Sequence, residues 1–81
     1  MSGKLREALA SNAHDAWAGW MRWVYDKGTW NPDGSFTINP ASAERWARQM
    51  GTPYRELSEQ EKDSDRDEAD KILAIINEAL S

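Results

Sequence analysis

The chain has 81 residues and a formal net charge of −4, with five Trp, a single His and no Cys. This length allows one domain with a small core, and the lack of Cys excludes a disulfide framework, a thiolate nucleophile and a Cys-based zinc site. Because no apolar run approaches the roughly 18 residues of a membrane span, we expect a cytoplasmic protein that does not enter a membrane.

The first predicted element is a helix from Lys4 to about Lys27. An alternative start is Ala13, because Asn12 can cap a helix that begins there. Apolar residues recur at helical spacing along this segment, and they define the face expected to be buried. They are Leu5, Leu9, Ala13, Ala16, Trp17, Trp20, Met21 and Val24.

One flank of this helix carries residues that are candidates for a site, His14 and Trp17, followed by Met21 and Tyr25. An indole at the wall of a pocket can stack on a nucleobase. A lone His without a partner Ser or Cys is usually structural, so we do not expect His14 to be catalytic. Trp20 points to the middle of the apolar face, where we expect it to fill the core.

A β-hairpin or tight loop is predicted after Gly28, which ends the first helix. Asn31–Gly34 reads NPDG, in which Pro presets the backbone of the second turn position and Gly supplies a positive φ. Strand-forming residues flank this turn at 29–30 and 36–38. Such a hairpin is only marginally stable alone. Five Trp and a small core suggest that another copy of the chain covers some aromatic surface, and Trp30 is our candidate for that contact.

The second predicted helix covers Pro40 to Met50. Asn39 is its expected N-cap, Pro40 occupies the first helical position, and Gly51 ends it. Residues 52–54 are expected to form an extended connector into the third helix.

The third predicted helix begins at Ser58, because Ser58 and Glu61 have the spacing of a capping box. Lys62, Asp65 and Arg66 share a stripe with its apolar residues. These charges mark either a binding site or the edge of the core, where Lys62 and Arg66 extend to water and Asp65 pairs with one of them. The apolar part of the stripe consists of Ala69, Ile72, Leu73, Ile76, Ala79 and Leu80.

Charge and motif content exclude several functions. Residues 55–81 carry nine Asp and Glu against four Lys and Arg, so general nucleic-acid binding is not expected. No phosphate-binding glycine loop or zinc-protease motif is present. The Asp-rich run at 63–67 lacks the Gly and Glu of a calcium loop, since Glu68 and Ala74 occupy those positions. We therefore expect no metal, no cofactor and no catalysis.

Two motifs resemble those of a known module. HDAWA at 14–18 and TPYRELSEQEKDSDR at 52–66, with RWARQM at 45–50, resemble the RyR domain, a small repeat of ryanodine receptors. The similarity extends over about residues 12–77 and is greatest to the small stand-alone RyR-like proteins of phages and prophages. Receptor repeats carry a GWxYG element, which Trp23-Val24-Tyr25 only partly matches. Met21 stands where those repeats carry a basic residue, with Arg22 following.

The resemblance implies a fold and a function. It implies a single mainly α-helical domain over residues 1–81, with three helices and a short hairpin after the first. It also implies recognition of a nucleotide-derived molecule, for which Trp17 would stack on a base and Lys62 and Arg66 would bind phosphate or ribose oxygens. The full set of implied ligand-binding residues is His14, Trp17, Tyr54, Lys62, Asp65 and Arg66, with Asp65 orienting Arg66 and Leu57 structural.

Two functions remain open at this point. The first is non-catalytic binding of a small nucleotide derivative, as a phage anti-defence sponge would sequester a host immune signal in the bacterial cytoplasm. The second is a protein–protein interaction module that uses the acidic third helix and exposed Trp residues. A homodimer or higher homo-oligomer is expected with either function, because five Trp exceed the needs of so small a core.

Overall fold

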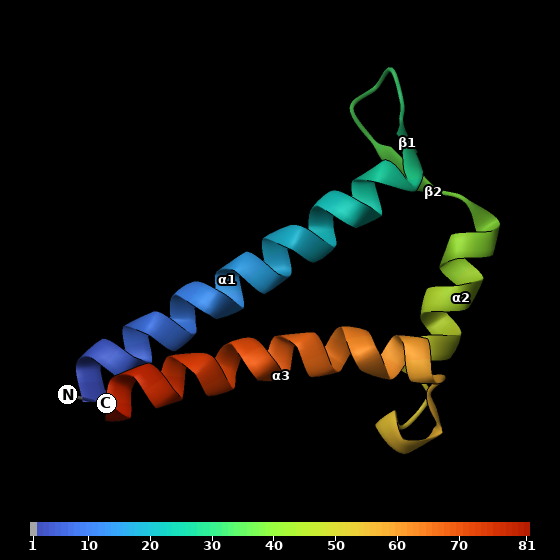
Figure 1. Ribbon diagram of the computed structural model, residues 1–81. Helices are drawn as coiled ribbons and strands as arrows, with labels where there is room; N and C mark the ends of the chain where they lie inside the picture. The colour runs from blue at the N-terminus through green and yellow to red at the C-terminus, as the bar shows by residue number, and fades with distance from the viewer. Residues whose placement is uncertain (1) are drawn as a thin grey trace. The chain divides into compact units, whose positions relative to one another are not determined.

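The computed structural model describes residues 2–81, and it is mainly helical, with 76% of the chain in helices (Figure 1). Three helices and a two-stranded antiparallel hairpin after the first helix confirm the predicted fold class. The elements follow in the order α1 (Ser2–Asp26), β1 (Gly28–Trp30), β2 (Phe36–Ile38), α2 (Pro40–Met50), the 3₁₀ turn η1 (Tyr54–Glu56) and α3 (Glu59–Leu80).

The chain divides into two units, and α1 contributes to both. The terminal unit consists of the first part of α1, up to Ala18, and residues 58–81 with α3. The central unit consists of residues 19–57, with the end of α1, the hairpin, α2 and η1.

Helix α1 is continuous from Ser2 to Asp26, so the alternative start at Ala13 is wrong. Asn12 lies within the helix, where its side chain cannot act as an N-cap. The helical spacing of the apolar residues on both sides of Asn12 outweighs the low helix propensity of one Asn, which is well under about 1 kcal/mol.

The hairpin and α2 form as the turn and cap residues predict. Strand β1 pairs with β2 in a register that sets Gly28 opposite Ile38 and Trp30 opposite Phe36. Gly34 has a φ of 90°, and its N–H donates to the Asn31 carbonyl over 3.0 Å, which closes the NPDG turn.

The predicted role of Asn39 as the N-cap of α2 is confirmed. Its side-chain oxygen accepts a hydrogen bond from the backbone N–H of Ser42 at 2.8 Å, while its amide nitrogen donates to the Lys27 carbonyl at 2.6 Å. One side chain therefore caps α2 and links it to the residue that precedes the hairpin.

The connector after α2 is only partly as predicted. Thr52 and Pro53 are not helical, but Tyr54 begins the 3₁₀ turn η1 instead of remaining extended. Pro53 has a φ of −60°, which suits the residue that precedes a turn, and the Pro53 carbonyl accepts from the Glu56 N–H at 2.9 Å.

Helix α3 starts with the predicted capping box. The Ser58 hydroxyl accepts from the Glu61 N–H at 3.2 Å, and the Glu61 carboxylate accepts from the Ser58 N–H at 3.1 Å. Both bonds satisfy backbone donors that a helix start would otherwise leave unpaired.

Few apolar side chains are buried in the part of the chain that the structure describes. Val24 is the buried hydrophobic residue of residues 3–81, the range over which side-chain burial is described, and Ser42 is the buried polar one. The prediction that Trp20 fills the core is wrong, since it is 45% exposed. The expected stripe of α3 is also largely open, with Ile72, Leu73 and Leu80 exposed. Within residues 2–81, no helix has the length and apolar character needed to cross a membrane.

Candidate functional site

Trp17 and His14 form an open aromatic pair on α1, in the terminal unit. They are three residues apart, so both side chains lie on one face of the helix. Their ring centroids are 5.9 Å apart with the planes at 42°, and Trp17 is 59% exposed. A large indole surface is therefore available for stacking, next to a side chain with two nitrogen atoms that can form hydrogen bonds.

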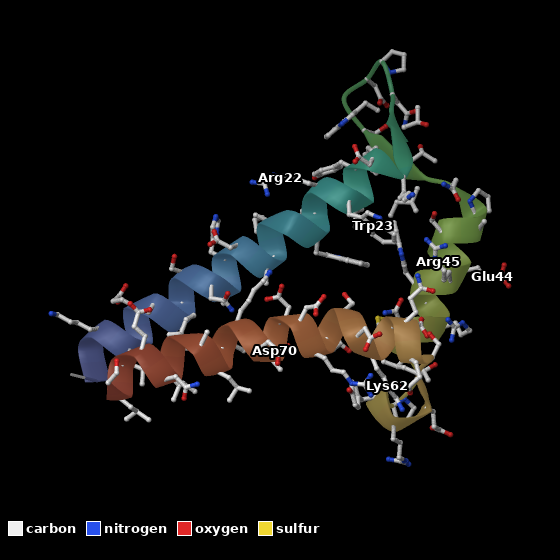
Figure 2. The ribbon with its side chains drawn as sticks, viewed as in Figure 1. Arg22, Trp23, Glu44, Arg45, Lys62 and Asp70 are labelled. Carbon is white, nitrogen blue, oxygen red and sulfur yellow. The ribbon has the colours of Figure 1, made fainter. Side chains whose placement is uncertain are left out.

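Lys62 and Arg66 belong to an ion-pair network at the start of α3. Arg66 Nη1 lies 3.2 Å from Glu59 Oε1 and 2.9 Å from Asp63 Oδ1, and Lys62 Nζ lies 3.4 Å from Glu59 Oε2. The Lys62 side chain is only 16% exposed, whereas that of Arg66 is 45% exposed. Glu59 thus connects the two cations, and Figure 2 labels Lys62 in this network.

The same network changes the acidity of Glu59. Hydrogen bonds from Arg66 and then Lys62, reinforced by their charges, hold the pKa of Glu59 below its ordinary value of 4.5. Its carboxylate therefore stays charged to lower pH than that of an isolated Glu. Glu59 and Asp63 can perform the orienting role for Arg66 that the resemblance assigns to Asp65.

The structure brings some of the six predicted residues together. His14 is in ring contact with Trp17, and Lys62 and Arg66 share Glu59. Asp65 is exposed on α3. Tyr54 belongs to η1 in the central unit, where its side chain is exposed.

A surface hollow of about 350 Å³ lies elsewhere in the terminal unit. Its walls come from the beginning of α1 and the end of α3, and it is lined by Lys4, Leu5, Ala8, Ile75, Glu78 and Ala79. The predicted ligand residues of this unit do not line it. Over residues 2–81, no three His, Asp or Glu side chains are grouped so that they could hold a metal ion.

No family model matches this chain. Comparison with family models, with curated proteins and with solved structures gave no match in any of the three. The resemblance to the RyR domain and the ligand residues that it implies therefore stay predictions.

The central unit contains an aromatic group that the sequence reasoning missed. Trp20 and Trp23 of α1 contact Trp46 of α2, with ring centroids 5.1 to 5.5 Å apart. We call these three residues the indole cluster. The spacing of Trp20 and Trp23, three positions apart, predicts that they share a face, but their contact with Trp46 depends on the packing of two helices.

A second aromatic group holds the hairpin against the end of α1. Trp30 stacks on Tyr25 with centroids 5.2 Å apart and planes at 25°, and Phe36 meets both rings edge-on at 4.9 and 5.1 Å. Trp30 is nevertheless 60% exposed. The group stabilises a hairpin that would be marginal alone, and it leaves one indole open to solvent.

Proposed function

We propose that the chain binds a small nucleotide-derived molecule without chemically changing it. The observation that carries this proposal is the exposed indole of Trp17 beside His14. An exposed indole offers a flat face on which a base can stack, a contact worth about 1–3 kcal/mol, and His14 beside it can supply hydrogen bonds.

The cations of α3 support the proposal as well. Lys62 and Arg66 are held in place by carboxylates, so a phosphate group must exchange with an existing ion pair. The pair of Arg66 with Asp63 is exposed on both sides, and exposed pairs of this kind contribute only about 0–1 kcal/mol, so its loss costs little. A phosphate that takes the place of Asp63 on Arg66 exchanges one charge-assisted pair for another, and the side chains already fixed by these carboxylates lose little entropy in the exchange.

Substitution of Arg66 tests this site. In calorimetric titrations with adenine nucleotides, ADP-ribose and cyclic dinucleotides, Arg66→Ala should weaken binding at least tenfold. Lys71→Ala is a matched control, because Lys71 forms a similar pair with Glu68 at 3.1 Å on the same helix but is not a predicted ligand residue. Equal affinity of wild type and a folded Arg66→Ala variant would contradict the proposal.

The absence of chemistry is tested by recovery of the ligand. No nucleophile and base pair is predicted, so the bound compound should be released intact after denaturation. Chromatography of the released molecule checks this. Repeated conversion to a new product would contradict the non-catalytic proposal and make His14 the first residue to replace.

Protein–protein interaction is the second candidate, and a different observation favours it. Ile72 and Leu73 on α3, and Trp30 on the hairpin, are exposed apolar side chains that a partner could cover. The simplest partner is another copy of the chain. Light scattering at tens of micromolar should then give at least a dimer mass, and a monomer mass would count against self-association.

A further inference from the structure

The indole cluster presents an aromatic surface that is only partly covered. Trp20 is 45% exposed and Trp23 is 36% exposed, although both contact Trp46. Their rings are tilted or edge-on to one another, at 36° to 63°, so they do not cover each other's faces by parallel stacking. The more exposed of the two indoles, that of Trp20, is therefore the surface on which a planar molecule can stack.

Two cations lie on one ring of this cluster. Lys27 Nζ is 5.5 Å from the Trp23 ring centroid, and Arg45 Cζ is 5.6 Å from it. Figure 2 shows Trp23 and Arg45 directed toward each other from α1 and α2, whereas Arg22 and Glu44 point away. Both cations are within the range of a cation–π contact.

Neither cation has an acidic partner among residues 2–81, in contrast to Lys62, Arg66 and Lys71 of the terminal unit. The sequence of the central unit also differs in charge. Residues 19–57 carry five Lys and Arg against four Asp and Glu, while the rest of the chain carries five against ten. The cluster is thus a locally cationic aromatic surface on an acidic protein, which favours an anion.

The third feature is a hydrogen-bond donor inside the cluster. The indole N–H of Trp46 is buried and has no acceptor in the described part of the chain. Buried donors are normally paired, so an unpaired one calls for an explanation, and a water, an ion or a ligand atom that supplies the acceptor is one. Because this N–H is covered, an acceptor can reach it only after a neighbouring side chain moves.

We propose that Trp20, Trp23 and Trp46, with Lys27 and Arg45, form a second ligand site for a planar anion, an aromatic ring that carries a phosphate or carboxylate group. The ring stacks on the exposed indole of Trp20, and the anionic group binds Lys27 and Arg45, which lie over the neighbouring Trp23. All five residues belong to the central unit and none is a predicted ligand residue of the terminal unit, so the proposal does not depend on the function proposed for those residues.

The five indole N–H groups allow a direct test by two-dimensional ¹H–¹⁵N NMR of the ¹⁵N-labelled protein. Single Trp→Phe variants assign the resonances, and the protein is titrated with AMP, benzoate, adenosine and inorganic phosphate. AMP or benzoate should shift the resonances of Trp20, Trp23 and Trp46. Adenosine lacks the charge and phosphate lacks the ring, so each should bind at least tenfold more weakly than the planar anion.

The probes also show whether the anionic group of the ligand is a phosphate or a carboxylate. If AMP shifts the resonances and benzoate does not, the ligand is a ring that carries a phosphate. If benzoate shifts them and AMP does not, the ligand is an aromatic carboxylate. If both shift them, the site accepts any planar ring with an anionic group. The site is overturned if neither probe shifts these three resonances at millimolar concentration. A shift of Trp17 alone would overturn it too, while leaving the function proposed for the terminal unit intact.

Substitution of the cations supplies the matched control. Lys27→Gln with Arg45→Gln should weaken binding of the responding probe at least tenfold, whereas Arg22→Gln should change it less than twofold. All three side chains are exposed, and circular dichroism checks that the helices remain. Undiminished binding by the folded double variant would overturn the proposal, and so would an equal loss in Arg22→Gln.

Discussion

Replacement of Gly28 by Ala tests the packing of the hairpin on the end of α1. Gly28 begins β1 and lies opposite Ile38 of β2. A Cβ atom built on Gly28 overlaps the Phe36 ring and the backbone carbonyl oxygen of Thr37. The aromatic ring can rotate, but the carbonyl is part of the paired strand. The added methyl group must therefore displace β2 or disturb the contact of Phe36 with Tyr25.

The expected effect follows from the cost of overpacking. Insertion of a methyl group into a tight contact typically costs about 1–3 kcal/mol. For a domain of this size, each 1 kcal/mol corresponds to about 4–8 °C in Tm. Gly28→Ala should therefore lower the Tm, measured by circular dichroism, by at least about 4 °C, and it should change the fluorescence of Trp30.

Gly19→Ala is the matched control for this substitution. Gly19 lies inside α1, and nothing is within 4 Å of a Cβ built there. Because Ala is favoured over Gly in a helix by about 0.8–1 kcal/mol, this variant should melt at a higher temperature than the wild type. A Tm of Gly28→Ala within 1 °C of the wild-type Tm would contradict the close approach of Phe36 and Thr37 to Gly28.

Three further predictions concern caps and charges. Asn39→Ala removes a cap and a bond to Lys27, so the free energy of unfolding in urea should fall by about 1–2 kcal/mol, and an unchanged value would contradict the capping role. Ser58→Ala should lower the same quantity by about 1 kcal/mol, and circular dichroism should show less helix; equal stability would count against the capping box. Glu59 has a lowered pKa, so its contribution to stability is complete above pH 4.5 and is lost as the pH falls below that value. Melting curves of Glu59→Gln should therefore show a smaller loss of stability in acid than the wild type, and identical pH profiles would contradict the network with Arg66.

Local signals predicted the helix boundaries well because caps and turns act over a few residues. Ser58 and Glu61 determine the start of α3, and Asn39 determines that of α2, without help from distant parts of the chain. The partners of Arg66 were not predicted, since Asp65 was expected where the structure has Asp63 and Glu59. Asp63 lies three positions before Arg66, which is the spacing of an ion pair on a helix.

Burial and long-range contacts were not predictable in the same way. Periodicity identified the apolar face that carries Trp20, but it cannot tell whether another element covers that face. The contact of Trp23 with Arg45 joins α1 and α2, so its existence depends on how two helices pack. The indole cluster was therefore missed although all of its residues were visible in the sequence.

The most direct test of the proposed ligand-binding function is a thermal-shift measurement with a panel of adenine nucleotides, ADP-ribose and cyclic dinucleotides. A ligand at 100 times its Kd adds about 2.7 kcal/mol to the stability of the folded state. For a domain of this size, this corresponds to an increase in Tm of roughly 10–20 °C. We predict that at least one compound of the panel produces such a shift in the wild type and a much smaller one in Arg66→Ala. A Tm that no compound in the panel changes, even at millimolar concentration, would contradict the account.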